Sequence, residues 1–311
     1  MLTVLKTALE VGLIYGLVAL ALFISFSILN IADLSTDGCF TLGCAVGAML
    51  TIAGHPLLAL PAAMAAGVLS GFITAFLQTR LGVESILAGI ISNTGLYTIN
   101  LAVMGFSSNV SITGRATVFS LFKALTGGSQ WSTLVLLALL LGVIAVVLIR
   151  FFGTSLGLSI RATGDSLDMV SASSINPKAT ITIGLCLANA LTALAGCLIG
   201  EYNKFCDINL GTGMVTIALA SLIIGEVFAG RRGGVGKRVV CVVLGSIVYR
   251  LIIALALRLN ISAEYFKLVS AVIVAVAIAA PNMKDYVHLA KIRSNARKLR
   301  ALSGKGDETD A

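Results

Sequence analysis

The sequence predicts an all-α protein: a polytopic transmembrane helical bundle of about nine spans, with two polar helix breaks and one short cytoplasmic helix. Hydrophobic residues make up 58% of the 311 positions, charged residues only 12%, and the mean hydropathy is +1.01. Soluble domains have about 45–50% apolar and about 25% charged residues. Nine helices of about 20 residues each fill most of the chain. One integral membrane domain therefore accounts for the composition.

Runs with few or no charges predict where the spans lie. The first run is longer than a signal-peptide core and has no small-residue cleavage site after it, so we expect a retained helix. Glycines spaced four apart, such as Gly43 with Gly47 and Gly67 with Gly71, indicate close helix packing. The predicted spans are 3–28, 38–54, 57–78, 84–106, 131–152, 179–199, 213–229, 239–257 and 264–281.

The Lys and Arg residues predict the orientation, because cytoplasmic loops carry an excess of them. With a cytoplasmic C-terminus and nine spans, fifteen of these residues fall inside and five outside. Residues 1–283 then form the transmembrane domain, and residues 284–311 form a basic cytoplasmic tail that anionic lipids would hold at the surface. The same topology explains the net charge of +8 without nucleic-acid binding.

The first polar break is the segment Asn30 to Gly38, NIADLSTDG, which places two carboxylates between apolar runs. Backbone this polar is tolerated at membrane depth only where protein or a water-filled cavity surrounds it. We predict a break between two helices, with Asp37 capping the second one. An ordinary polar loop is the alternative.

The second polar break is the segment Cys206 to Gly213, CDINLGTG, whose pattern weakly echoes the first. Under the predicted topology the two breaks lie on opposite sides of the membrane. An inverted repeat of the kind found in transporters would produce this arrangement.

A 26-residue polar insert at 153–178 is predicted to lie in the cytoplasm. Asp165 or Ser166 would cap a short helix running to about Ser174, and Pro177 would open the next span. Such a helix is suited to docking a partner protein.

Three stretches resemble the permease family of bacterial ABC importers for branched-chain amino acids, ribose and nucleosides. They are NIADLSTDGCFTLGCAVGAML, the stretch from LGLSIRATGDSLDMV to ALAGCLIG, and GTGMVTIALASLIIGEVFAGRRGGVGKRVVCVVLGSIVYRL. The resemblance covers most of the chain. DLSTDGCFTLG and ILAGIISNTGLYTINLAVMG are most similar to the subgroup proposed for aromatic amino acids, tryptophan and tyrosine.

The resemblance implies a multi-pass protein of the bacterial plasma (inner) membrane. It would be the permease subunit of an ATP-driven, binding-protein-dependent importer of a small polar solute, an amino acid or alternatively a sugar or nucleoside. The implied partners are cytoplasmic ATPase subunits, an extracytoplasmic solute-binding protein and a second permease copy. This chain would then be no enzyme and hold no cofactor, because ATP and Mg would bind the ATPase. GGVGKR at 233–238 is not a Walker A loop, since Arg follows the Lys.

The resemblance also makes Gly164 to Ile175 the coupling helix that contacts the ATPase. The residues expected to serve this coupling are Arg161, Ala162, Gly164, Asp165, Asp168 and Ile175.

Polar residues on otherwise apolar spans are the candidates for a translocation path. Such side chains usually face the bundle interior or a cavity, although hydrogen bonding between helices would place them there too. The candidates are Asn30, Asp33, Ser35, Thr36, Ser92, Asn93, Asn100 and Asn189.

Two other function classes remain open from the residues alone. An ion-coupled secondary transporter also uses broken helices, and Asp33 and Asp37 would then carry the ion. An intramembrane enzyme would need a metal cluster or a nucleophile with its base, yet the only histidines are His55 and His288. No catalytic or metal site is predicted. Arg250 is expected to pair with buried charges such as Glu226 or Glu264.

Overall fold

The computed structural model describes residues 2–230 and 233–258, together with the single positions 268, 271, 272 and 275. The described helices and strands are α1 (Leu2–Leu22), η1 (Phe23–Ile28, a π-helix), α2 (Thr36–Ile52), α3 (Pro56–Thr79), α4 (Ser85–Val103), β1 (Asn109–Ser111), α5 (Val118–Leu125), α6 (Ser132–Phe151), α7 (Ser155–Asp165), α8 (Leu167–Ala172), α9 (Pro177–Asn203), β2 (Phe205–Asp207), α10 (Met214–Ala229) and α11 (Val235–Arg258).

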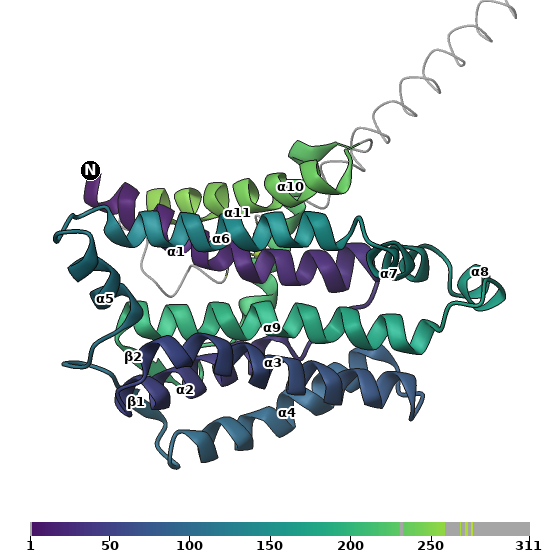
Figure 1. Cartoon of the computed structure of the whole chain (residues 1–311), viewed down its shortest axis with the longest axis horizontal. Helices are drawn as coiled ribbons and strands as arrows, with labels where there is room; N and C mark the ends of the chain where they lie inside the picture. Colours follow the sequence, from purple (N-terminus) through teal and green to yellow (C-terminus); the bar gives the residue numbers. More distant parts are fainter. Residues whose placement is uncertain (1, 231–232, 259–267, 269–270, 273–274, 276–311) are drawn as a thin grey trace, which may run out of the picture.

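The fold is an all-α bundle whose long helices lie side by side (Figure 1). Helices α1, α6 and α11 lie in its upper half in this view, and α9, α3, α2 and α4 lie below them. At one end are α5 and the two short strands, which pair antiparallel with Val110 opposite Cys206. At the other end α7 and α8 project beyond the bundle.

Eight of the nine predicted spans correspond to helices, but the count of nine crossings is not established. Among the described residues, six helices are long and apolar enough to cross a membrane: Val4–Ile28, Pro56–Thr79, Ser85–Val103, Ser132–Phe151, Pro177–Asn203 and Val235–Ala256. Helices α2 and α10 have only 17 and 16 residues, short of the roughly 20 that a crossing takes. The ninth predicted span and the basic tail lie outside the described residues, apart from four single positions.

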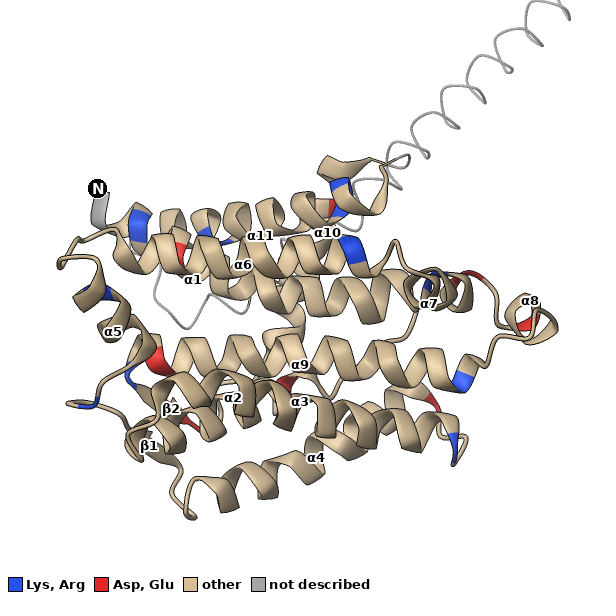
Figure 2. Cartoon of the chain, in the orientation of Figure 1, with Lys and Arg blue, Asp and Glu red and all other residues tan. Residues whose placement is uncertain are grey.

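Charged side chains of the described residues gather toward the two ends of the bundle, and the long middle stretch is mostly uncharged (Figure 2). This distribution fits helices that cross a membrane along their length, because an unpaired charge in hydrocarbon is costly. At the α8 end Arg238 of α11 forms an ion pair with Glu226 of α10 at 2.7 Å. The Arg238 guanidinium also donates a hydrogen bond to the Ser27 hydroxyl of η1 at 2.5 Å.

Helix α9 forms the centre of the lower half, and glycines let its neighbours approach it closely. A Cβ atom at Gly43 of α2 would overlap the carbonyl oxygen of Ala193, and one at Gly67 of α3 would overlap that of Asn189. The reverse also holds, since a Cβ at Gly196 would overlap the carbonyl oxygen of Phe40. The predicted glycine packing is confirmed, and its partner on both sides is α9.

The end of the bundle that carries α5 is fastened by Glu201 of α9. Its two carboxylate oxygens accept hydrogen bonds from the Thr51 hydroxyl at 3.0 Å and from the backbone amide of Val118 at 2.8 Å. Val118 is the first residue of α5, so a buried carboxylate satisfies one of the free amides at that helix start. Helix α5 was not predicted from the sequence.

We expect that Gly43→Val destabilises the folded protein, because side-chain atoms would have to displace the α9 backbone. Overpacking of this kind costs about 1–3 kcal/mol, so the thermal unfolding temperature in detergent should fall by several degrees. Gly142→Val on α6 is the control, since a Cβ there meets nothing within 4 Å. Equal unfolding temperatures for the two variants would refute this account of the packing.

Candidate functional site

The two polar breaks meet at one place inside the bundle. The first break contacts Asn189, which lies near the middle of α9, the longest helix. The second break contacts the first turn of α2: the Gly211 amide donates to the Thr41 hydroxyl at 3.1 Å. The chain enters the two segments from different ends of the bundle, because the first follows η1, whose last residue packs against Gly164 of α7, and the second begins in β2 near α5. That the two breaks open to opposite sides of the membrane stays a prediction. The predicted topology took α2 and α10 as complete crossings, whereas both are short helices whose N-termini come together inside the bundle.

Asp33 holds the first break in place. One of its carboxylate oxygens accepts from the Ser35 amide at 2.9 Å and from the Ser35 hydroxyl at 2.6 Å. The other accepts from the Asn189 side-chain amide at 2.8 Å. The Thr36 hydroxyl donates to the Asp33 carbonyl oxygen at 3.1 Å. Asp33, Ser35, Thr36 and Asn189 are all buried and form one network between the break and α9.

Asp37 lies in the first turn of α2 but binds the start of α10. Its carboxylate oxygens accept from the backbone amides of Gly213 and Val215, each at 2.9 Å. The predicted cap of α2 is thus wrong: Ser35 is the N-cap residue of that helix, and Asp37 serves the other one. A carboxylate at a helix N-terminus is favoured by the free amides and by the helix dipole. Asp37 therefore joins the two breaks.

A polar cavity of about 310 Å³ lies beside this junction, between α2, α4 and the second break. Asn100 of α4 is 1% exposed and donates to the Gly38 carbonyl oxygen at 3.0 Å, while its own side-chain oxygen has no hydrogen-bond partner within the described structure. A buried oxygen without a partner is costly, and this one is closed off from the cavity in this conformation, so a solute could reach it only if α4 or its side chain shifted. The cavity is lined by Asp37, Gly38, Thr41, Asn93, Thr94, Tyr97, Asn100, Ile208, Asn209 and Thr212.

The structure separates the eight path candidates into different surroundings. Asn93 and Asn100 line the cavity, and Asp33, Ser35, Thr36 and Asn189 form the adjoining network. Ser92 is buried elsewhere, where it accepts from the Thr74 hydroxyl at 2.9 Å between α3 and α4. Asn30 is exposed in a left-handed turn with a φ of 56°.

Besides Asp37, which the sequence had singled out for other roles, sequence reasoning missed five polar residues of the cavity: Thr41, Thr94, Tyr97, Asn209 and Thr212. Tyr97 follows Asn93 by four positions, so helical spacing places both on one face of α4. Asn209 and Thr212 belong to the second break, whose contact with α4 only the fold reveals.

The insert at 153–178, predicted to lie in the cytoplasm, forms two helices in place of one. Ser166 has an extended backbone and separates α7 from α8. Its hydroxyl caps α8 by accepting from the Met169 amide at 3.4 Å, so of the two predicted caps, Asp165 and Ser166, the second is confirmed. Leu167 and Met169 of α8 are 53% and 72% exposed. Exposed apolar side chains at the tip of a projecting helix favour contact with a partner protein.

The six coupling candidates do not all face outward. Arg161, Asp165 and Asp168 are exposed, and Ala162 and Ile175 are half-buried. Gly164 packs against the end of η1, where an added Cβ would overlap the carbonyl oxygen of Ile28. A bulky residue at Gly164 would therefore disturb the bundle itself. Substitutions of the exposed side chains of α8 would test coupling without disturbing the packing of the bundle.

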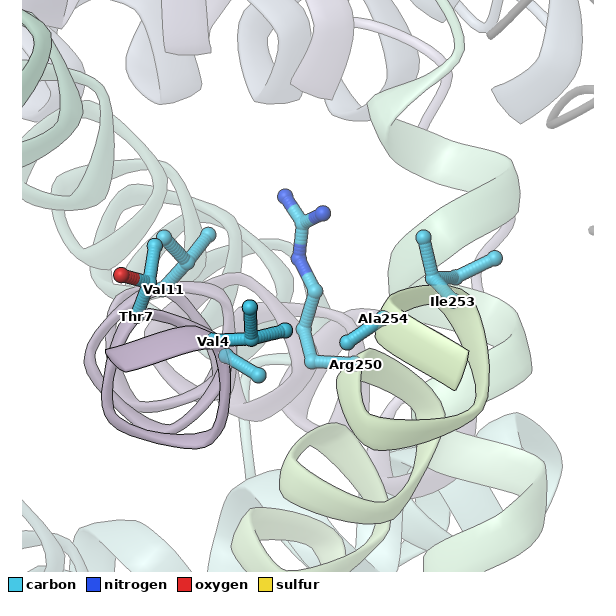
Figure 3. Close-up of a pocket in the computed structure, with 7 residues that line it drawn as sticks. Val4, Thr7, Val11, Arg250, Ile253 and Ala254 are labelled. Atoms are coloured by element: carbon cyan, nitrogen blue, oxygen red, sulfur yellow. The ribbon is translucent and has the colours of Figure 1, made fainter. Parts of the chain in front are cut away.

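Arg250 of α11 lies beside α1 in a separate, mostly apolar cavity of about 250 Å³ (Figure 3). Its guanidinium carbon is 4.0 Å from the centroid of the Tyr15 ring, a cation–π contact. Glu226 pairs with Arg238, so its expected pairing with Arg250 is wrong. Glu264 lies outside the described residues.

A bundle of apolar helices that are interrupted by short ones around a polar cavity is the arrangement expected of a membrane transport protein. The family model described as "Branched-chain amino acid transport system / permease component" matches residues 4–278. The chain therefore belongs to this permease family.

Curated relatives match over nearly their whole length. A "Tyrosine transport system permease protein" of Clostridioides difficile is 30% identical over 295 residues, which cover 94% of this chain and 95% of the relative. An uncharacterized protein of Rickettsia prowazekii is 31% identical over 285 residues, 91% of this chain and 99% of the relative. No solved structure matches the chain.

We expect Asp37→Ala to destabilise the protein, because two partly buried amides at the start of α10 would lose their acceptor. Unpartnered buried groups cost about 1–3 kcal/mol each, and partial exposure places these two at the low end, so a loss of about 2 kcal/mol is predicted. Asp37→Asn keeps one oxygen acceptor and should lose about half as much. Thermal unfolding in detergent measures the effect, with the exposed Asp168→Ala as control. An unfolding temperature of Asp37→Ala equal to that of the control would contradict the capping role.

Proposed function

We propose that this chain is the membrane-spanning permease subunit of an ATP-driven, binding-protein-dependent importer that moves an amino acid inward. The polar cavity at the junction of the two breaks carries the proposal, in a chain whose family transports solutes. The path would run through this cavity past Asn93 and Asn100. The Asp33 network would hold its wall, because Asp33 and Asn189 fix the break against α9.

The exposed face of α4 supports a second permease copy across the path. Thr94 and Tyr97 lie near the middle of this span and are exposed in the single chain. Polar groups at membrane depth usually face other protein or water in place of lipid. A second copy facing α4 would enclose the cavity, and a homodimer is the simplest such assembly.

The ATPase would dock on α8, with the C-terminus on the same, cytoplasmic side. Leu167 and Met169 offer apolar contacts, and the neighbouring Asp165 and Asp168 offer charged ones. ATP and Mg would bind that separate subunit, and a solute-binding protein would deliver the solute at the α5 end. This chain would then need no cofactor of its own.

The cavity chemistry supports a zwitterionic solute with a ring. The Asp37 carboxylate and the Asn93 side chain line the cavity and suit an ammonium group, while the Tyr97 ring offers an aromatic surface. The relative named for tyrosine transport points to the aromatic amino acids. Sugars and nucleosides are the alternatives, and competition for uptake distinguishes them.

An ion-coupled transporter would use Asp33 or Asp37 as the carrier of the ion. Both carboxylates already accept two or more hydrogen bonds that hold the breaks together. Vesicles that contain the permease without any ATPase test this alternative: uptake driven by an ion gradient alone would overturn the proposed function.

We predict that Asn93→Leu lowers ATP-dependent uptake into proteoliposomes of the assembled transporter at least tenfold. The Asn93 side chain makes no hydrogen bond within the described part of the chain, so its loss removes a polar wall of the cavity without breaking a hydrogen bond of the fold. Thr98→Leu is the control, because Thr98 is an exposed residue of α4 outside the cavity lining. Normal uptake by Asn93→Leu with unchanged thermal stability would remove this cavity from the path.

We also predict that Leu167→Glu combined with Met169→Glu separates the permease from its ATPase. The new charges would be desolvated in an apolar contact, which is costly. Co-purification of the ATPase and stimulated ATP turnover should both fall at least tenfold, while membrane insertion stays intact. The matched control places two Glu residues at Ser171 and Ser173, exposed positions near the end of the same helix. Full co-purification of the first variant would exclude docking on α8.

A further inference from the structure

A groove of about 600 Å³ lies between α3 and α9 at the end of the bundle that carries α8. Its polar end has two cationic side chains, Arg80 directly after α3 and Lys178 in the first turn of α9. Both are exposed, and neither side chain has an ion pair or hydrogen bond among the described residues. No Asp or Glu lines the groove, and the N-terminus of α9 adds further positive potential.

The other end of the groove is apolar. Phe72 and Phe76 lie one helical turn apart on α3 with ring centroids 6.4 Å apart, and Ile183 of α9 also lines the groove. The three side chains are 51%, 45% and 38% exposed. Since a helix rises about 1.5 Å per residue, Phe72 lies about 12 Å from Arg80 along α3. The groove thus changes from apolar to cationic along the membrane-crossing direction.

We propose that this groove binds one anionic phospholipid of the adjacent leaflet. The change in polarity follows that of a lipid, whose acyl chain would lie along Phe72, Phe76 and Ile183 and whose phosphate would lie between Arg80 and Lys178. Both α3 and α9 are long and apolar enough to cross a membrane, and α3 ends and α9 begins here, so the two cations would stand where the headgroups begin. Two cations without a carboxylate favour an anionic headgroup over a zwitterionic one.

The position of the groove links the lipid to the proposed coupling segment. Asn176 lines the groove and caps α9 by accepting from the amides of Lys178 and Ala179. The chain reaches Asn176 directly from α8, so a bound headgroup would touch the base of that projection. This lipid site does not depend on the proposed transport function, because it requires only that α3 and α9 cross the membrane.

Native mass spectrometry of the detergent-purified full chain tests the proposal by titration with phosphatidylglycerol and, separately, phosphatidylcholine. We expect tighter binding of phosphatidylglycerol. Each basic residue at an anionic surface contributes about fivefold, so Arg80→Ala with Lys178→Ala should weaken that binding about thirtyfold. Arg150→Ala is the control, because Arg150 is an exposed cation at the same end of the bundle but outside the groove. Arg80→Lys with Lys178→Arg preserves the charges and should retain binding.

Three results would overturn the proposal. The first is phosphatidylglycerol affinity that the double alanine variant leaves unchanged. The second is displacement of the lipid by inorganic phosphate at equal concentration, which would define a site for free anions. If the site is a lipid site, Phe76→Ser should weaken lipid binding without changing phosphate binding. The third is efficient crosslinking of a cysteine placed at Ala179 to the ATPase in the assembled transporter, which would assign the groove to that protein.

Discussion

The close approach of α9 to α2 and α3 is the constraint on which the rest of the structure depends. Glycines on both sides bring backbone against backbone, so the three helices cannot separate or slide without opening a void or a clash. Gly43 and Gly67 face α9 from two helices, and Gly196 of α9 faces α2 in return. This packing fixes where Asn189 lies along the bundle. It therefore also fixes where Asn189 can hold the first break.

Interrupting a helix at membrane depth creates free amides and carbonyl groups that lipid cannot satisfy. In this protein two interruptions come together, and side chains supply some of the missing partners. Asp33 serves the first break, and Asp37 crosses to the start of α10. Beside them, the Asn100 side chain of α4 donates to the Gly38 carbonyl oxygen, while its own oxygen has no partner in the described structure. The same arrangement that stabilises the junction therefore leaves a polar cavity beside it.

The two ends of the bundle differ in how tightly they are built. At one end Glu201 ties α9 to α2 and α5, and Tyr202 donates to Glu10 of α1 at 2.9 Å. At the other end α8 extends outward with exposed apolar side chains, above a groove whose cations have no partner among the described residues. One end held by buried hydrogen bonds and the other end with exposed apolar and cationic side chains suit a transporter that meets different partners on the two sides of the membrane.

Composition and the lengths of the apolar runs were enough to predict a helical membrane protein, because lipid permits few other structures. The spacing of Gly43 and Gly47 predicted close packing, and the polar segments near Asp33 and Gly211 predicted breaks. The depth of those breaks was decided only by tertiary structure. A short helix can end partway through a bundle when a neighbour satisfies its terminus, and the neighbour of α10 is Asp37, about 175 positions earlier in the chain. Contacts over that separation leave no periodic signal in the sequence, so Tyr97 and Asn209 could be placed in one cavity only by the fold.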